Sequence, residues 1–357
     1  MLSAGQSKIR VRYSDIEEDL RKRILAGEFA DGCALPGEIP LSKSYSASRK
    51  TVRKALEQLC NQNFISKSRG LGNFVIPAAE RDKMPRITER IRVMIPEEGL
   101  QQDFCSEVVA GIQKYAAVNG VAVTLGSVSE TTASLTEQYR NFQCDAFLWC
   151  SVPEEKLSTV KTLAGLHIPQ VVIGNSIPGA GAVFYDSLPA WHSLLFMLHN
   201  AGHSNAAFLE RAQVAEWSSK RQQAMKNAAR KLDMNCTILN AEPGDQNALE
   251  NFMREHAEIN AFVAISPWTE AFRNVLDKMS MQIPEDFSFA EMTAAGVDND
   301  SQITRIYIPS QGMGFAAAEM LATHDFRKDP APVREIGCFT VAGLSTGAVN
   351  VKKRFVS

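Results

Sequence analysis

The sequence lacks any run of about 18 consecutive apolar residues, the length a helix needs to cross a bilayer, so we expect no membrane span. The opening stretch MLSAGQSKIRVRYSD has no apolar segment before a cleavage site, so we expect no signal peptide. The seven cysteines are odd in number and scattered, and none forms a C-x-x-C pair. This pattern excludes a disulfide framework or zinc finger and favours reduced thiols in a cytoplasmic protein.

The chain also has little net charge, −2 over 357 residues, but the charge is distributed unevenly. Residues 1–85 hold 15 Lys and Arg against 10 Asp and Glu, whereas the remaining residues hold 23 against 30. A basic small module followed by a larger acidic part predicts a polyanionic partner for the first part only. The length itself suits two or three domains.

The basic part has a pattern typical of a winged helix-turn-helix. Apolar spacing predicts a helix over 13–27, begun by a Ser14–Glu17 capping box and ended by Gly27. A short helix is expected over 38–45, and a third starts at Ser48 as N-cap. Two short strands joined by a glycine-containing turn should follow in FISKSRGLGNFVIP.

The third helix carries cations where a helix normally disfavours them. Arg49, Lys50, Arg53 and Lys54 crowd its first two turns, close to the positive end of the helix dipole. A solvated basic face would explain a charge run alone. A helix that enters the DNA major groove by its N-terminal end, however, needs donors and cations there. The pattern therefore predicts binding to double-stranded DNA.

The motifs YSDIEEDLRKRILAGEF, LPGE, SRKTVRKALEQL and GLGNFV, in this order, resemble the N-terminal DNA-binding domain of the GntR family of bacterial transcription regulators. The resemblance implies DNA contacts from the recognition helix and its neighbours, and a wing that approaches the minor groove. The matching helix positions are Glu38, Ser48, Arg49, Thr51 and Arg53, and those of the wing are Gly70 and Gly72. Gly37 and Ile39 replace the family's usual Ser and Arg, so one usual arginine contact is missing.

After a polar segment over 77–87, read as a linker between a 1–76 domain and an 88–357 domain, apolar strands alternate with helices. This alternation predicts parallel sheets covered on both faces and arranged as two doubly wound lobes. The blocks HIPQVVIGN, VFYDSLPAWHSLLFMLHNAGHSNAAFLE, QIPEDFSFAEM and GLSTG resemble the LacI-type sugar-sensing domain, related to periplasmic binding proteins. The combination is similar to the arabinose-utilisation repressor architecture, with a first lobe crossing near residue 186.

In such two-lobed domains the ligand lies in the crevice at the carboxyl ends of the strands. The resemblance assigns ligand contact to Arg221, whose guanidinium could face hydroxyls or a carboxylate. Tyr185 and Asp186 end a strand at the predicted crossing, where Asp186 either accepts from the ligand or caps the next helix.

Aromatic residues and one polar residue complete the predicted ligand contacts. Trp149, Trp217 and Trp268 lie at strand ends or loops, where each either stacks on a sugar ring or packs in the core. Pro267-Trp268 and the Glu291–Thr293 stretch replace family segments that carry sugar acceptors, so Thr293 is included as a candidate contact and the ligand stays unnamed.

Together these features predict a dimeric, ligand-responsive DNA-binding regulator, most simply a repressor of carbohydrate-use genes, with no cofactor. Two alternatives remain: a constitutive regulator whose second domain only dimerises, or an enzyme fused to a DNA-binding head. No nucleophile–base pair or pair of acids stands in an enzyme motif, and His199 and His203 lack a third metal ligand.

Overall fold

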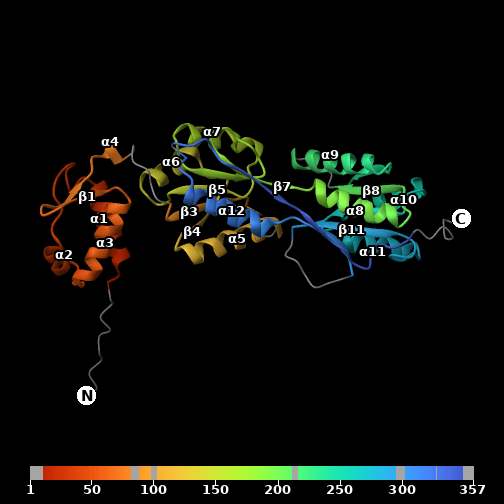
Figure 1. Ribbon diagram of the computed structural model, residues 1–357, viewed down its shortest axis with the longest axis horizontal. Coiled ribbons are helices and arrows are strands. Elements are labelled where there is room, and N and C mark those ends of the chain that lie inside the picture. Colours follow the sequence, from red (N-terminus) through yellow and green to blue (C-terminus); the bar gives the residue numbers. More distant parts are fainter. Residues whose placement is uncertain are drawn as a thin grey trace, which may run out of the picture. The chain divides into compact units, whose positions relative to one another are not determined.

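The computed structural model describes residues 11–81, 88–97, 103–210, 216–294, 302–326 and 328–348. The chain divides into two compact units (Figure 1). The first, called the head unit, comprises Met1–Glu89 together with Thr136–Asp145, and the second, called the α/β unit, comprises Arg90–Leu135 and Ala146–Ser357. No helix in these described ranges is long and apolar enough to cross a membrane.

The head unit contains the predicted helices and hairpin. They are α1 (Tyr13–Leu25), α2 (Glu38–Ser44), α3 (Arg49–Asn61), β1 (Ile65–Ser68), β2 (Gly72–Val75) and α4 (Ala78–Arg81). The predicted Ser14–Glu17 capping box is wrong. Arg12 is the N-cap of α1, and its backbone N–H donates to the Asp15 carboxylate at 3.0 Å. The acid one turn into the helix therefore comes two residues earlier than expected. Gly27 ends the helix region with φ +77°, as glycine at this position allows.

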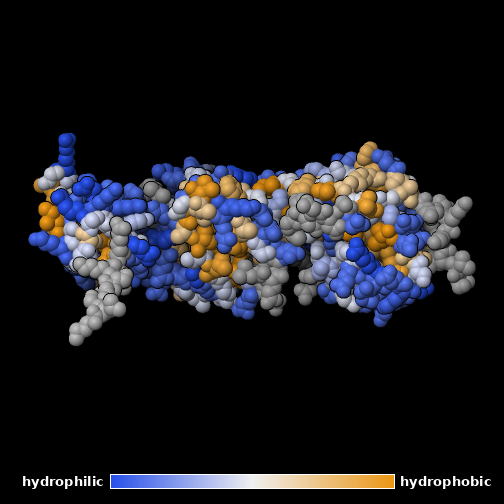
Figure 2. Space-filling view, turned by 90° about the horizontal axis from the view of Figure 1, so that it is seen from below, coloured by the Kyte–Doolittle hydropathy of each residue, from blue (hydrophilic) through white to orange (hydrophobic). Residues whose placement is uncertain are grey.

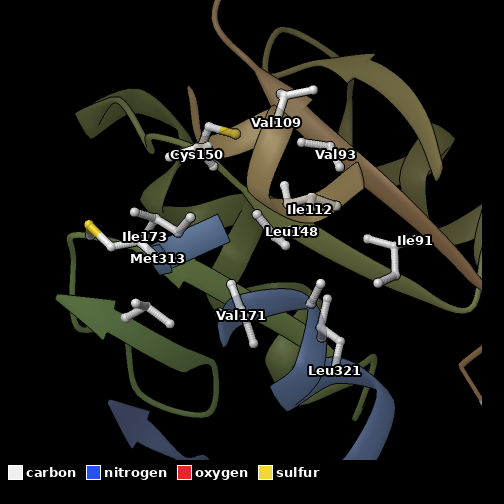
Figure 3. Packing of buried hydrophobic residues seen from close by; sticks show 14 of the residues in the cluster. Ile91, Val93, Val109, Ile112, Leu148, Cys150, Val171, Ile173, Met313 and Leu321 are labelled. Carbon is white, nitrogen blue, oxygen red and sulfur yellow. The ribbon is translucent and has the colours of Figure 1, made fainter. Parts of the chain in front are cut away.

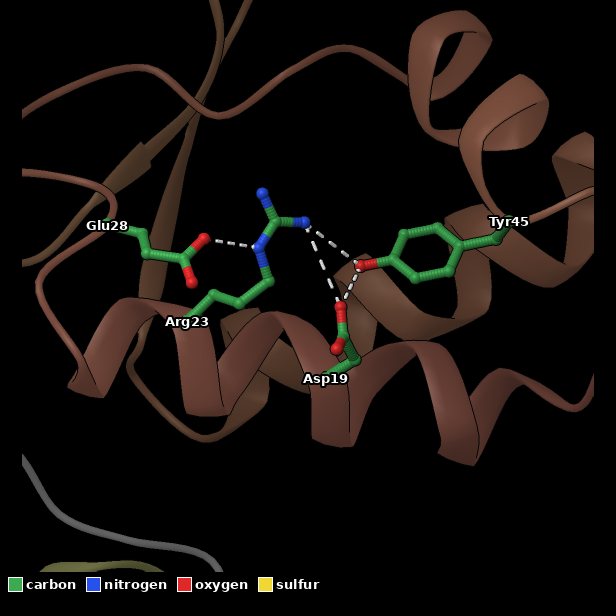
Figure 4. Close-up of polar contacts among 4 residues, drawn as sticks. All are labelled: Asp19, Arg23, Glu28 and Tyr45. Carbon is green, nitrogen blue, oxygen red and sulfur yellow. Dashed lines mark hydrogen bonds and ion pairs between the residues drawn. The ribbon is translucent and has the colours of Figure 1, made fainter.

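The core of the head lies between α1, α3 and the hairpin. Ile16 and Leu20 of α1 pack with Val52 and Leu59, which lie on the buried face of α3. A polar cluster holds α2 and the loop after α1 in place (Figure 4). The Arg23 side chain donates to the Glu28 carboxylate at 2.7 Å and to the Tyr45 hydroxyl at 3.4 Å. That hydroxyl in turn donates to Asp19.

The α/β unit has two lobes, each built on a sheet that is six-stranded within the described residues. The first sheet is parallel throughout and runs in the order β13 (Val333–Gly337), β7 (Gly181–Asp186), β6 (Gln170–Ile173), β5 (Ala146–Trp149), β3 (Arg90–Ile95) and β4 (Ala122–Ser127). Its helices are α5 (Asp103–Asn119), α7 (Leu157–Gly165) after the short turn η2 (Glu154–Lys156), and α12 (Ser310–Thr323). Helix α6 (Thr132–Arg140) starts in this lobe, and its residues from Thr136 onward belong to the head unit.

The second sheet runs in the order β14 (Phe339–Val341), β12 (Thr304–Tyr307), β11 (Ser288–Thr293), β10 (Ala261–Ile265), β8 (Asn205–Glu210) and β9 (Asn235–Asn240). Only β14, within this sheet, pairs antiparallel. Its helices are α8 (Leu188–Asn200), α9 (Glu216–Lys231), α10 (Gln246–Glu255) and α11 (Thr269–Lys278). The prediction of a doubly wound α/β fold with parallel sheets is confirmed.

Helix α12 follows a strand of the second sheet but packs in the first lobe. Met313, Ala317 and Leu321 join the core formed by Leu148, Val171 and their neighbours (Figure 3). Its crossing with α5 is unusually close, because a Cβ on Gly314 would lie 2.0 Å from the carbonyl oxygen of Val108. This close approach of α12 to α5 is possible because Gly314 has no Cβ.

Candidate functional site

The first candidate site is the N-terminal end of α3. The Ser48 hydroxyl accepts a hydrogen bond from the Thr51 backbone N–H at 3.1 Å, which confirms Ser48 as the N-cap. Its Oγ also lies 2.7 Å from the Thr51 Oγ1. Thr51 thereby supports the cap and fixes the first turn, and Lys50 lies exposed on that same turn.

Glu38 organises the two arginines predicted to contact DNA. Its carboxylate accepts from Arg53 Nε at 2.9 Å and from Arg53 Nη2 at 2.8 Å, and Arg49 Nη2 lies 3.8 Å away. The hydrogen bond from Arg53 lowers the pKa of Glu38. Both guanidinium groups remain exposed to solvent. The guanidinium of Arg53 on α3 is therefore held by Glu38 on α2. Its orientation depends on both helices.

The hairpin forms a wing with an apolar tip. Gly70 and Gly72 adopt φ of +80° and +111°, which glycine permits without strain. Leu71 between them is 73% exposed, and Ile39 on α2, where the family has Arg, is also exposed. Lys54 lies on another side of α3, with Nζ 4.0 Å from the ring centroid of Tyr13. The sequence analysis missed Leu71, although a large apolar residue between two turn glycines is a visible signal.

The second candidate site is a cavity of about 170 Å³ at the crossing from the first lobe to the second. The first lobe contributes the end of β7, and α9 of the second lobe contributes Arg221. The lining residues are Gly174, Phe184, Tyr185, Asp186, Ser187, Lys220, Arg221, Ala224 and Glu335. The structure thus brings Tyr185, Asp186 and Arg221 together around one cavity.

Arg221 is a buried cation with a buried partner. Its Nη2 donates to Glu210 at 3.0 Å, and its Nη1 donates to the Tyr185 hydroxyl at 3.2 Å. The side chains are 15% exposed for Arg221 and 2% exposed for Glu210. Burial opposes charge on Arg221, but Tyr185 and Glu210 outweigh it and raise the pKa of the guanidinium. The pair is therefore charged and internally neutralised.

One donor of this cluster is available for a further partner. Arg221 Nε is buried and has no hydrogen-bond partner among the described residues. Burial raises the pKa of Tyr185, so its hydroxyl stays protonated at neutral pH. Asp186 combines a contact at the start of the next helix with a place in the cavity wall. Its Oδ1 accepts from the Leu188 backbone N–H at 2.9 Å at the start of α8, and its side chain lines the cavity.

Three other predicted contacts lie elsewhere. Trp149 is fully buried and donates its indole N–H to Gln170 at 3.1 Å, and Trp268 is fully buried among Phe272 and its neighbours. Thr293 is buried at the end of β11 and does not line the cavity. These residues pack in the lobes because their strands and loops turn them inward. The side chain of Trp217, in the first turn of α9, lies outside the described residues.

The sequence analysis missed Glu210, Phe184, Lys220 and Glu335. Lys220 Nζ lies 5.3 Å from the Phe184 ring centroid, beside Arg221. Glu210 ends a buried strand, and an acid in that position was the available signal. A larger cavity of about 510 Å³ lies in the second lobe beside α11 and Pro284. We favour the smaller cavity as the effector site because it lies at the lobe crossing and is lined by Arg221, whose buried Nε has no hydrogen-bond partner among the described residues.

The described residues contain no group of three His, Cys, Asp or Glu placed to hold a metal ion. His203, considered above as a ligand, is buried instead. Its Nδ1 lies 2.7 Å from Asn260 Oδ1, and its Nε2 lies 2.9 Å from Ser288 Oγ and 3.1 Å from the Gly347 carbonyl. It joins the C-terminal segment to the second sheet.

Two family models match two separate parts of the chain. Residues 12–75 match the model for bacterial regulatory proteins of the gntR family, and residues 196–346 match that of a periplasmic binding protein-like domain. The chain joins a GntR-family domain to a periplasmic-binding-protein-like domain. The GntR-family match begins at the N-cap of α1 and ends in the wing.

Curated relatives are similar mainly over parts of the chain. The arabinose metabolism transcriptional repressor of Halalkalibacterium halodurans is 22% identical over 121 residues, which is 34% of this chain and 32% of that protein. The mannosyl-D-glycerate transport/metabolism system repressor of Escherichia coli is 40% identical over 63 residues, 18% of this chain and 26% of that protein. This chain thus spans a third or less of the length of each of these relatives.

Among solved structures, a LacI family transcriptional regulator from Enterococcus faecium with bound ribose is similar in fold. It is 17% identical, with a TM-score of 0.59, and the match covers 73% of this chain and 100% of that chain. The likeness places the α/β unit in the two-lobed fold of that regulator.

Proposed function

We propose that this protein is a sequence-specific DNA-binding transcription regulator whose DNA affinity changes when a small effector binds at the lobe crossing. The observation that carries the proposal is the cation-bearing, Ser48-capped end of α3 on a GntR-family domain. That end presents donors to solvent, although helix electrostatics disfavour cations there in the absence of an anion. Phosphate and base acceptors of the major groove supply the missing partners.

Glu38 sets the geometry of the DNA-reading residues. Because its carboxylate holds Arg53 by two hydrogen bonds, the guanidinium is oriented before DNA arrives. An oriented fork loses less conformational entropy on binding a guanine edge. Arg49, 3.8 Å from the same carboxylate, can pair with a base or a phosphate. The wing, with Gly70 and Gly72 at its turn, lies against the neighbouring groove.

We propose that the effector is a small, neutral, hydroxyl-bearing compound such as a sugar. Glu210 already neutralises Arg221, so an anionic effector would add an unpaired charge to a buried site. The groups that would contact the effector are the Arg221 Nε donor, the Tyr185 hydroxyl and the Asp186 carboxylate. The cavity, about 170 Å³, is smaller than the ~300–1,000 Å³ of drug-sized pockets.

The remaining assignments follow from this role. We propose a cytoplasmic homodimer without catalytic function that represses carbohydrate-use genes. The names of both curated relatives describe those proteins as repressors of sugar-related systems. The domain limits proposed are 1–76 for DNA binding, 77–87 for the linker and 88–357 for effector binding and dimerisation, although Thr136–Asp145 of the last range packs in the head unit. A dimer of such heads fits a near-palindromic operator with half-sites about one or two helical turns apart.

The test begins with selection of a preferred DNA sequence by the full chain from a random duplex library, followed by anisotropy titrations. Arg53→Ala should weaken specific binding by about 1–3 kcal/mol, since it loses a base contact. Lys54→Ala is the matched control, because Lys54 lies over Tyr13, and it should change affinity much less. Failure to select any sequence, or equal affinities for the wild type and Arg53→Ala, would contradict the proposal.

The effector is then sought by titrating neutral sugars, sugar acids and sugar phosphates against the protein–DNA complex. A neutral sugar should change DNA affinity, and Tyr185→Phe should weaken that response. Tyr185→Phe is preferred to Arg221→Ala, which would strand the buried Glu210 charge at a cost of about 3–5 kcal/mol. A response to sugar acids or phosphates alone would contradict the neutral class. No response from any compound would favour a domain that only dimerises.

A further inference from the structure

A ten-residue segment of the chain belongs to the head unit although the chain before and after it builds the α/β unit. This segment, Thr136–Asp145, is called the insert. The first residues of α6 precede it and β5 follows it. It lies outside both family matches, which cover residues 12–75 and 196–346. Neither family model accounts for its position in the head.

Phe142 anchors the insert in the hydrophobic core of the head. Its side chain is 4% exposed, and its ring centroid lies 4.1 Å from that of the fully buried Phe64. Arg81 of α4 covers the same Phe64 ring, with its guanidinium carbon 5.2 Å from the centroid. Phe142 therefore fills a place in the core that the winged-helix elements leave for it.

The backbone at Phe142 adopts a conformation that needs support from its surroundings. Its φ is +57°, a left-handed value that bulky residues rarely adopt. Such a conformation persists where neighbouring contacts determine it. Here the Phe142 N–H donates to the Tyr139 carbonyl at 3.1 Å, and the Gln143 N–H donates to the Gln138 carbonyl at 2.9 Å. The turn points the phenyl ring into the core of the head.

A polar chain forms a second attachment. Gln62, the C-cap of α3, donates its side-chain amide to Glu89 at 3.3 Å. The Glu89 backbone N–H donates to the buried Asp145 carboxylate at 3.1 Å. The residues that follow, Arg90 and Ala146, begin the neighbouring strands β3 and β5. The end of α3 opposite its cation-bearing turns is thus connected to the starts of two sheet strands.

We propose that the insert is the element through which the α/β unit acts on the head. The chain passes between the two units at three peptide bonds, 89–90, 135–136 and 145–146, instead of through one linker. A change in the strands that these bonds enter is transmitted to Phe142 and to the C-terminal end of α3. The transmission role rests on the proposed function, whereas the anchoring of the insert does not.

Hydrogen–deuterium exchange of the full chain tests the anchoring. In Phe142→Ala, the amides of Phe64 and Ile76, which donate to the Leu59 and Phe64 carbonyls, should exchange at least about tenfold faster. Leu163→Ala is the control, because Leu163 is fully buried in α7 of the α/β unit. It should leave these head amides unchanged. Wild-type exchange rates in the head of Phe142→Ala would overturn the proposal.

Two milder variants keep the test valid if Phe142→Ala does not fold. Phe142→Leu should accelerate the same head amides to a smaller extent. Phe64→Leu should accelerate the amides of Asn141 and Gln143 in the insert, which donate to the Glu137 and Gln138 carbonyls. If neither variant changes exchange across the Phe64–Phe142 contact, the insert is not anchored there.

The transmission role is tested separately with the selected DNA and the effector. Phe142→Leu should still bind DNA, but the ratio of affinities with and without effector should move toward one. An unchanged ratio would overturn transmission through the insert. A wild-type protein without effector response would instead contradict the proposed function, and the exchange result would still decide whether the insert is anchored.

Discussion

At the scale of single residues, the function proposed here depends on how each charge is partnered. Glu38 orients Arg53, the Tyr13 ring holds Lys54, and Glu210 neutralises Arg221. Each partner comes from a different element from the cation it meets. Two neighbouring cations on one helix, Arg53 and Lys54, therefore have different partners. This difference makes them a suitable pair of test and control.

Tyr45 gives a prediction on pH. Burial, together with the hydrogen bond donated to Asp19, raises the pKa of Tyr45 to about 12 from its ordinary value near 10. Because the folded head holds the phenolic proton more tightly than the unfolded chain does, this stabilisation is complete below about pH 10. It is lost as the pH rises through about 12.

The measurement is urea unfolding of wild type and Tyr45→Phe at a series of pH values, followed by circular dichroism. The free energy of unfolding of the wild type should fall more steeply above about pH 10 than that of Tyr45→Phe. Phenolate absorbance gives the direct check, since the difference between the two proteins should titrate near pH 12. A difference that titrates near pH 10 would show that Tyr45 is not held in this way.

At the scale of secondary-structure elements, capping residues in the sequence predicted helix ends correctly in two cases. Ser48 caps α3, and Gly27 follows α1. The start of α1 was misplaced because four acids lie within five residues after Ser14 and several of them could cap the helix. The backbone geometry selects Asp15, and Glu17 instead pairs with Arg21 at 3.2 Å. A choice among equivalent acids is thus made by the local backbone geometry, which spacing alone does not reveal.

The crossing of α5 and α12 gives a prediction at this scale. Gly314→Ala places a Cβ 2.0 Å from the Val108 carbonyl oxygen, so the helices must separate. We expect a loss of about 1–3 kcal/mol or more, as for other overpacked sites. Gly312→Ala is the control on the same helix, since its Cβ would meet nothing closer than 3.9 Å.

Gly312→Ala should be neutral or stabilise by up to about 1 kcal/mol, because alanine favours helix. Urea unfolding followed by tryptophan fluorescence measures both variants, since all four tryptophans lie beyond residue 145 and report on the α/β unit. Equal midpoints for Gly312→Ala and Gly314→Ala would contradict the close crossing.

At the scale of the whole molecule, the proposed dimer needs an apolar surface. Val118 at the end of α5 is 82% exposed, and Leu125 on β4 and Phe315 on α12 are exposed as well. Figure 2 shows hydrophobic side chains gathered on the face that carries α5. Patches of this kind mark association sites more often than chance exposure does. We therefore expect the proposed dimer to form through this face.

Val118→Asp should shift the protein toward monomer in sedimentation velocity at micromolar concentration. A buried unpaired carboxylate at an apolar interface is costly, and at the surface of a monomer it is not. Leu166→Asp, on an exposed residue after α7, is the control and should leave the oligomeric state unchanged. If both variants sediment like the wild type, the dimer uses another face.

The sequence by itself determined the order of elements, the basic head and the alternating lobes, because these follow from local spacing and charge, whereas Arg221 was singled out only by family resemblance. Only the tertiary structure decided that Trp149 and Trp268 are buried, that Glu210 neutralises Arg221, and that Phe142 packs against Phe64. The two contacts join residues that are distant in sequence. Each Trp could equally have faced a ligand or the core. Periodicity cannot choose between such environments, whereas close packing of the whole fold permits only one.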